Sequence, residues 1–223
     1  MTALQDRSNY PITVDSVIFG YAEGALQVAL IERERDPFKG MWAIPGGFME
    51  GDETVEETAH RELKEETGLE SIYLEQFHVC SSHGRDPRGR TITVAFFALI
   101  DSDKYHMVAS QDALQAKWWP AYKLPPLAFH QDEIYQKALQ ALRIAVKTRP
   151  IAFELLPKFF TLTQLQILFE QLFGIAIDKR NFRRKVAKME FIVATDKKQE
   201  GEKHRPATLY YYDQKRYKEF YNI

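Results

Sequence analysis

Short runs of β-branched and apolar residues, broken by turn-forming residues, dominate the first hundred positions of the chain. The runs at 12–20 and 25–32 are separated by the turn pair Glu23 and Gly24, and this pattern predicts a β-hairpin. Further strands are predicted at 41–44, 72–78 and 91–99. The last turn-like break before the first helical pattern is Pro45 with the glycine pair that follows it.

Helical spacing of apolar residues appears twice in the same part of the chain. Val55, Ala59 and Leu63 form one apolar stripe, in a helix that begins near Thr54 and ends at Gly68. A second, amphipathic helix is predicted over 131–147, with Pro150 as the boundary after it. Residues 1–150 are therefore expected to form one domain of mixed α+β class.

The remainder of the chain starts a new pattern. Thr161 and Gln164 fit a helix capping box, and Gly174 fits the end of that short helix. Asp178 can cap a second helix running from 179 to about 189, and the strand-like runs 191–195 and 207–212 flank a charged loop. Two helices joined by a tight turn and followed by a strand pair predict a small winged helix-turn-helix domain over 151–223.

Composition and charge support two domains with different partners. The chain has 223 residues, of which 45% are hydrophobic and 27% charged, and this is typical of a soluble globular protein. Residues 1–150 carry a net charge of −6 and residues 151–223 a net charge of +5, so a polyanion is the expected partner of the C-terminal part. The start of the chain lacks a secretory signal pattern, and a cytoplasmic location is expected by default. Cys80, the single cysteine, is expected to be a buried residue without chemistry.

Basic residues are concentrated where a DNA-binding domain of this kind would need them. They project from the outer side of the second helix, opposite Phe182 and Val186, and recur in the charged loop. The candidate DNA-binding residues are Lys179, Arg180, Arg183, Arg184, Lys188, Lys197, Lys198, Lys203 and Arg205. The alternative is a helical cap or dimerisation module with solvated lysines, because small winged helices also bind proteins.

The acidic segment 47–69 carries the clearest chemical signal. At about 100° per residue, Glu62, Glu65 and Glu66 fall within an arc of roughly 100° on the helix. Like charges at this spacing repel one another, so a cation among them would stabilise the helix. Carboxylate oxygens suit Mg²⁺ or Mn²⁺. The alternative for such a helix is a solvated acidic face.

The spacing of this segment favours the metal site. From Gly47 to Leu69 it reads Gly-x5-Glu-x7-Arg-Glu-Leu-x-Glu-Glu-x-Gly-Leu, which matches the Nudix box at every specified position, so the chain resembles the Nudix hydrolases. The resemblance implies an α/β/α sandwich in which Glu62, Glu65 and Glu66 ligate Mg²⁺ or Mn²⁺ and the Gly46 or Gly47 carbonyl adds a ligand. It also implies that Arg61 pairs with Glu53 to brace the loop. The implied chemistry is attack of a metal-activated water on a diphosphate.

Three further segments, at 85–90, 117–120 and 124–129, resemble those of ADP-ribose pyrophosphatases. That resemblance implies that Arg85, Arg88 and Arg90 bind the pyrophosphate while aromatic groups contact the base. In the alternative, the arginine loop is an exposed turn, and Trp118 and Trp119 are core residues. Many such hydrolases supply a glutamate base late in the domain, but 101–116 contains no glutamate and offers only Asp101, Asp103 and Asp112. Hydrolysis therefore stays open.

The C-terminal segments 160–166, 172–174, 178–185 and 205–210 resemble the C-terminal domain of the Nudix-related transcriptional regulators. Members of that family are homodimers whose Nudix domain senses ADP-ribose or a related metabolite, and the ligand releases them from operator DNA. The first functional hypothesis is accordingly a metabolite-responsive transcriptional regulator that binds double-stranded DNA. The second is a Mg²⁺-dependent ADP-ribose pyrophosphatase with a structural or protein-interaction C-terminal module.

Overall fold

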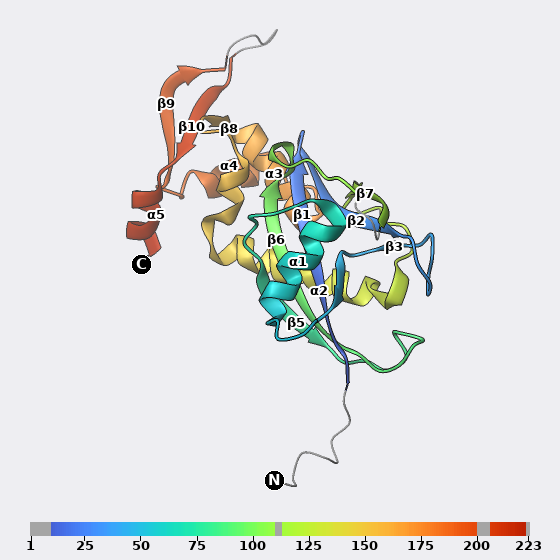
Figure 1. Ribbon diagram of the computed structural model, residues 1–223. Coiled ribbons are helices and arrows are strands. Elements are labelled where there is room, and N and C mark those ends of the chain that lie inside the picture. The colour runs from blue at the N-terminus through green and yellow to red at the C-terminus, as the bar shows by residue number, and fades with distance from the viewer. Residues whose placement is uncertain (1–9, 110–112, 200–205, 222–223) are drawn as a thin grey trace, which may run out of the picture. The chain divides into compact units, whose positions relative to one another are not determined.

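The computed structural model describes residues 10–109, 113–199 and 206–221 (Figure 1). The described chain forms two compact units, one of residues 10–22 with 27–142 and the other of residues 23–26 with 143–221. Each unit has its own sheet. No helix within the described ranges is both long and apolar enough to span a membrane.

A mixed sheet forms the centre of the first unit. Its strands run in the order β3-β2-β1-β6-β5, β4 pairs with β1, and β7 pairs with β2. The central pair, β1 and β6, is parallel, while β4, β5, β3 and β7 pair antiparallel. The strands are β1 (Ile12–Ala22), β2 (Ala25–Arg33), β3 (Trp42–Ala43), β4 (Gly46–Phe48), β5 (Glu75–Cys80), β6 (Ile92–Asp101) and β7 (Ala113–Pro120). The predicted hairpin forms, and Glu23 and Gly24 at its turn both adopt positive φ.

Helices cover both faces of this sheet. Leu63 of α1 (Val55–Thr67) packs with Ile18 on one face. On the other face the ring of Tyr135, from α2 (Asp132–Thr148), lies 5.9 Å from that of Phe19. Because Ile18 and Phe19 are consecutive in a strand, their side chains point to opposite faces. The expected α/β/α sandwich is therefore confirmed. Two short 3₁₀ helices, η1 (Ser102–Lys104) and η2 (Ala128–His130), lie in its connections.

The second unit is a small helix-turn-helix with a three-stranded sheet in the order β8-β10-β9. Its elements are η3 (Pro150–Leu155), β8 (Phe160–Thr161), α3 (Leu162–Phe173), α4 (Lys179–Val186), β9 (Ile192–Lys198), β10 (Thr208–Tyr212) and α5 (Gln214–Tyr221). The predicted capping box is present. The Thr161 hydroxyl oxygen accepts a hydrogen bond from the Gln164 backbone amide, and the Gln164 side-chain oxygen accepts one from the Thr161 backbone amide. Gly174 ends α3 with φ 66°, a left-handed conformation that suits glycine.

The core of the second unit fixes the orientation of α4. Phe182 and Val186 of α4 pack with Leu165 of α3 and with Phe191, all of them buried. The helix ends at Val186, three residues before the expected end. Met189 lies in the turn after it, because the chain must turn there to bring Phe191 into the core. The apolar side of α4 thus faces inwards, and its basic side faces solvent.

Some elements differ from the prediction. β5 begins at Glu75 and runs to Cys80, later than the run predicted at 72–78, and Cys80 is buried as expected. β4, β7 and α5 were not predicted at all. The division between the compact units falls within α2, and the domain boundary near Pro150 stays a prediction.

Candidate functional site

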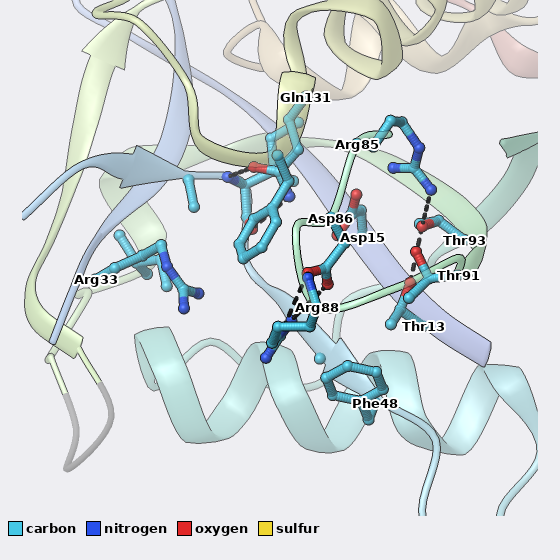
Figure 2. Close-up of a pocket in the computed structure, with 15 residues that line it drawn as sticks. Thr13, Asp15, Arg33, Phe48, Arg85, Asp86, Arg88, Thr91, Thr93 and Gln131 are labelled. Carbon is cyan, nitrogen blue, oxygen red and sulfur yellow. Dashed lines mark hydrogen bonds and ion pairs between the residues drawn. The ribbon is translucent and has the colours of Figure 1, made fainter. Parts of the chain in front are cut away.

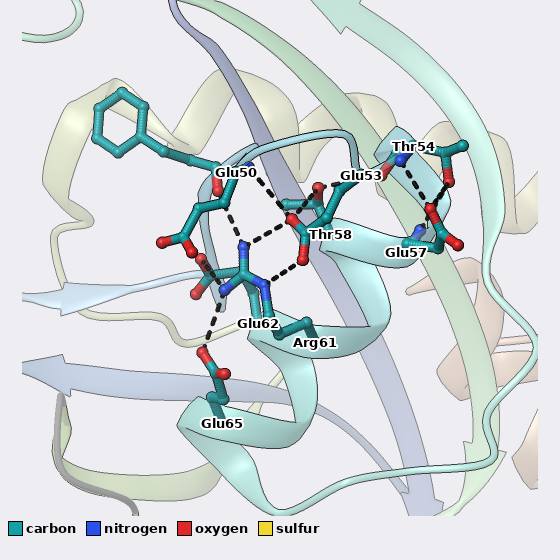
Figure 3. Close-up of polar contacts among 9 residues, drawn as sticks. Glu50, Glu53, Thr54, Glu57, Thr58, Arg61, Glu62 and Glu65 are labelled. Carbon is teal, nitrogen blue, oxygen red and sulfur yellow. Dashed lines mark hydrogen bonds and ion pairs between the residues drawn. The ribbon is translucent and has the colours of Figure 1, made fainter.

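The loop before α1 is held by one arginine. The Arg61 guanidinium donates two hydrogen bonds to the Glu53 carboxylate, at 2.7 and 3.0 Å, and one to the Phe48 carbonyl oxygen at 3.0 Å (Figure 3). The same side chain reaches Glu62 at 2.9 Å and Glu65 at 3.1 Å. The Arg61–Glu53 pair that the resemblance implied is thus present, and it ties the loop to the helix.

This network sets the charge states of the loop. Hydrogen bonds from Arg61 lower the pKa of Glu53 to about 2, and the same contact raises the pKa of Arg61. Thr54 caps α1 in a reciprocal box with Glu57, whose pKa is lowered by the Thr54 backbone amide. The loop therefore enters α1 in one defined conformation.

Two acidic side chains of α1 meet the glycine pair 46–47. Glu66 accepts a hydrogen bond of 2.8 Å from the Gly46 amide. The Glu62 carboxylate lies so close to Gly47 that a Cβ atom there would be 2.1 Å from Glu62 Oε1. A side chain at position 47 would therefore displace the Glu62 carboxylate from its place beside the glycine pair. The predicted box residues Glu62, Glu66 and Gly47 are thus brought together.

Burial makes these two carboxylates unfavourable as bare anions. It raises the pKa of Glu66 to about 8, and the nearby Glu62 charge raises it further. Burial also raises the pKa of Glu62, against the opposing effect of Arg61. A buried and a partly buried carboxylate that repel each other beside a glycine backbone fit a hard divalent cation, whose charge would offset both effects.

The third predicted ligand is placed differently. Glu65 is 55% exposed in its side chain and pairs with Arg61. Across the described ranges, no three His, Cys, Asp or Glu side chains are already arranged around a cation position. The helical wheel predicted that three glutamates converge. Glu62 and Glu66 do lie together at the glycine pair, while Glu65 would have to break its ion pair with Arg61 to join them.

Gly47 also lines a cavity, which Figure 2 shows with its lining side chains. Its buried side chains come from β1, β2, β3, β6, the β5–β6 loop and the residue before α2. Its exposed rim includes Phe48 and Arg88. The lining residues that matter below are Thr13, Asp15, Arg33, Phe48, Arg85, Asp86, Arg88, Thr93, Phe129 and Gln131. Because Gly47 lines this cavity and lies next to Glu62, the cavity adjoins the acidic site.

The structure separates the three predicted arginines. Arg85 is buried and donates to Thr93 Oγ1 at 2.7 Å. Arg88 pairs with Asp86 at 2.7 Å, and its guanidinium carbon lies 5.0 Å from the Phe48 ring centre. Both line the cavity. Arg90 does not: it is exposed and lies over the Tyr10 ring at 4.6 Å.

Arg33, at the end of β2, is a cavity residue that the sequence reasoning missed. Its guanidinium carbon lies 4.7 Å from the Phe129 ring centre, and Arg88 approaches the same ring at 5.5 Å. Phe129 itself has φ 54°, a costly conformation for a residue other than glycine, and such strain gathers at binding sites. The two arginines at this ring lie beside the acidic site. They could bind an anionic group of a ligand whose other side contacts a cation at the acidic site.

The other sequence candidates lie elsewhere in the first unit. Asp101 pairs with Lys104 at 3.0 Å and Asp103 is exposed, while Asp112 lies outside the described residues. Neither Asp101 nor Asp103 lines the cavity. Trp118 packs against the core that contains Leu63, and Trp119 contacts Trp42 at 5.1 Å between ring centres. Trp118 and Trp119 are both partly buried and neither lines the cavity, whereas Phe129, from the 124–129 segment, does.

The second unit presents a basic helix face. Asp178 caps α4 by accepting from the Asn181 amide at 2.8 Å. Five basic side chains of this segment are exposed, and Lys185 among them was not named from the sequence: Lys179, Arg180, Arg184, Lys185 and Lys188. Arg183 is partly buried and reaches towards Thr163 of α3 at 3.4 Å, so it lies back against the domain.

The strand pair beside α4 adds further positive charge. Lys197 and Lys198 at the end of β9 are exposed, and the Lys197 ammonium lies 4.7 Å from the Phe159 ring centre. Lys203 and Arg205 lie outside the described residues. An exposed basic helix next to a basic strand end is the arrangement that a winged helix needs for docking in a major groove.

Two protein-family models match this chain. The NUDIX domain model matches residues 10–138, and the model for the NrtR DNA-binding winged helix domain matches residues 152–212. The matches cover the two units that carry the cavity and the basic helix.

Two relatives are similar to this chain over different lengths. An ADPR responsive transcriptional repressor NtrR from Acinetobacter baylyi is 38% identical over 216 residues, which is 93% of this chain and 85% of the relative. An ADP-ribose pyrophosphatase from Methanocaldococcus jannaschii is 42% identical over 123 residues, which is 55% of this chain and 69% of the relative.

Two solved structures of Shewanella oneidensis NrtR are similar to this chain. Its complex with a 27mer DNA has a TM-score of 0.70 at 33% identity, covering 92% of this chain and 94% of that one. Its NUDIX domain complexed with ADP ribose has a TM-score of 0.58 at 32% identity, covering 63% and 93%. The chain therefore belongs to the NrtR family of Nudix-related transcriptional regulators, in which a NUDIX domain is joined to a DNA-binding winged helix domain.

Proposed function

We propose that this chain is a transcriptional regulator that binds operator DNA through its winged helix and ADP-ribose through the cavity of its NUDIX domain. The exposed basic face of α4, fixed by the burial of Phe182 and Val186, carries the DNA-binding half of the proposal. In this role Arg180, Arg184 and Lys188 face the major groove, and Lys197 and Lys198 bind phosphates. The bound DNA and ADP-ribose in the Shewanella oneidensis NrtR structures support both halves.

The cavity fits a nucleoside diphosphate on charge and position. Arg33 and Arg88 supply positive charge at the rim, and the acidic site at Gly47 adjoins them. We propose that Mg²⁺ or Mn²⁺ is held by Glu62, Glu66 and the Gly47 carbonyl, and by Glu65 once it releases Arg61. The cation would neutralise diphosphate charge. Arg33 and Arg88 would orient the diphosphate from the opposite side.

A homodimer is part of the proposal, since helix-turn-helix proteins commonly read two half-sites with two copies. ADP-ribose is proposed to favour a state of the dimer with lower DNA affinity, so that it releases the repressor. The ligand must then bind the free and the DNA-bound forms with different affinities.

The DNA-binding half is tested by selecting duplexes from a random library with the full chain. A palindromic consensus is expected, with affinity that falls steeply as salt concentration rises. The double variant Arg180→Ala/Arg184→Ala should lose enrichment. Lys64→Ala, which removes an exposed lysine of the NUDIX domain, should keep it. Selection of no sequence by the wild type would reject this function.

Hydrolysis of ADP-ribose is a second candidate function, favoured by the complete Nudix box and by the similarity to the Methanocaldococcus jannaschii enzyme. Incubation with ADP-ribose and Mg²⁺ should release AMP, and Glu66→Gln should stop that release. DNA selection and AMP release are independent readouts, so either function can fail alone.

A further inference from the structure

The closed end of the cavity is a polar floor of buried side chains, defined here as Asp15, Arg85, Thr93 and Gln131. Asp15 is 7% exposed, Arg85 6%, Thr93 2% and Gln131 3%. Phe48 and Arg88 at the rim are far more open to solvent. Figure 2 shows Asp15 between Arg85 and the Arg88 side of the cavity. A charged residue on a central strand is costly to bury, and the Gln131 contact and the nearby Arg85 charge offset only part of that cost for Asp15.

The floor side chains are locked by bonds to their neighbours. Gln131 holds both backbone groups of Ile44, accepting from its amide at 2.8 Å and donating to its carbonyl at 3.4 Å, and it also hydrogen-bonds Asp15. Arg85 donates to Thr93 Oγ1, which is itself 2.7 Å from Thr13 Oγ1. The floor is therefore a rigid set of polar groups.

One donor and one acceptor of the floor remain for a ligand. Arg85 Nε is buried and has no hydrogen-bond partner in the described part of the chain. Asp15 offers carboxylate oxygens, which accept. A hydroxyl group donates and accepts at once, so vicinal hydroxyls match this pair. A phosphate only accepts, and Asp15 would repel it.

The short distance from the diphosphate position to the floor favours a sugar over the base as the group bound at the floor. A Cβ atom on Gly46 would lie 2.9 Å from Asp15 Oδ1, so the floor directly adjoins the glycine pair at which the diphosphate is proposed to bind. In ADP-ribose a ribose is attached directly to each phosphate, while adenine is one sugar further away. Because the floor is closed, it suits the end of the ligand; the adenosine end extends towards Phe48 and Phe129 at the rim, where a base can stack.

We propose that Asp15, held in place by Gln131, binds the vicinal hydroxyls of the terminal ribose of ADP-ribose together with Arg85, and that this floor sets the ligand specificity of the NUDIX domain. The inference rests on the proposed binding of ADP-ribose. An acidic side chain that accepts from ribose hydroxyls is an established means of sugar recognition in nucleotide-binding folds. Ligands that carry the diphosphate and the adenosine but lack the terminal hydroxyls should therefore bind poorly.

The test compares two ligands of equal charge. Both are α,β-methylene analogues, which resist hydrolysis: one of ADP-ribose, the other with a hydroxyl-free tetrahydrofuran ring in place of the terminal ribose. Calorimetric titration of the wild-type chain with Mg²⁺ should give about tenfold to a hundredfold tighter binding of the ribose analogue, the range expected for hydrogen bonds to a charged group. Asp15→Asn should reduce this ratio to below about threefold. The matched control Asp132→Asn, which changes an exposed residue outside the cavity, should retain the wild-type ratio.

Each other outcome has a distinct meaning. Equal affinity of the two analogues for the wild type overturns the inference without any variant, and so does an unchanged ratio in Asp15→Asn. Binding of neither analogue by the wild type refutes the proposed function itself.

Discussion

Replacing Glu66 by glutamine removes a carboxylate that the fold buries at the end of the Nudix box. Glutamine keeps an oxygen that can accept from the Gly46 amide, so the 2.8 Å hydrogen bond can persist while the charge disappears. In the metal-free protein that charge is unfavourable, because burial and the neighbouring Glu62 raise the pKa of Glu66 to about 8 from its usual 4.5. We predict that Glu66→Gln stabilises the metal-free NUDIX domain at alkaline pH.

The sign follows from proton linkage. Between about pH 4.5 and pH 8 the folded protein holds a proton on Glu66 that the unfolded chain has lost, so this group lowers the free energy of unfolding as pH rises through that window. With about 1.4 kcal/mol for each pKa unit, the full effect is at most roughly 5 kcal/mol. The variant should therefore match the wild type near pH 5 and exceed it by roughly 2–5 kcal/mol above pH 8.

Tryptophan fluorescence isolates the relevant unit, because Trp42, Trp118 and Trp119 are the chain's three tryptophans and all lie in the NUDIX domain. Urea unfolding in EDTA at several pH values measures the difference in free energy of unfolding between variant and wild type. The contributions of the other titrating groups cancel in this difference. The exposed neighbour Glu65→Gln serves as control and should show no gain that grows with pH. A stability difference of the same size at pH 5 and pH 8.5, or a variant less stable at pH 8.5, would show that burial of the Glu66 charge does not destabilise the domain.

Three further predictions follow from the contacts of the two domains. Gly47→Ala should abolish the rise in melting temperature on adding Mg²⁺, because its Cβ atom would collide with the Glu62 carboxylate; a wild-type rise measured by tryptophan fluorescence would contradict this. Arg61→Ala should lower NUDIX stability by about 1–3 kcal/mol in urea unfolding, since four acceptor groups lose their donor, and Arg61→Lys should recover only part; an unchanged midpoint for Arg61→Ala would argue against the brace. Lys198→Ala should lower the slope of log affinity for DNA against log salt concentration by about one, with ADP-ribose affinity unchanged; an unchanged slope would remove Lys198 from the interface.

Local signals in the sequence predicted most of the elements correctly. The ends of α1 and α3 followed from Thr54, Gly68, Thr161 and Gly174, because capping depends on nearby residues. β7 escaped prediction, since it is defined by long-range pairing with β2 and its sequence has no clear alternation. α5 was missed because its aromatic residues resemble a continuation of the preceding strand, while the core contact of Tyr217 favours a helix.

The acidic box was readable because its spacing is a local pattern, whereas the cavity depends on tertiary structure. Arg33 ends a strand, Gln131 precedes a helix, and Phe129 has a strained backbone, so nothing in their neighbours marks them. Asp15 did carry a signal: a carboxylate inside the apolar run 12–20 is unusual on a central strand. The ion pair between Glu65 and Arg61 could not be predicted from a helical wheel, because the wheel takes no account of the competing arginine one turn earlier.

The most direct test of the proposed regulator measures DNA affinity with and without its ligand. A fluorescein-labelled duplex carrying the selected consensus is titrated with the full chain by anisotropy, at fixed salt and with Mg²⁺, in the absence and presence of the α,β-methylene analogue of ADP-ribose. A saturating concentration of the analogue is expected to weaken DNA binding at least tenfold, the size of an ordinary allosteric coupling. Identical or tighter DNA binding with the analogue present would contradict the proposed release from DNA by ADP-ribose.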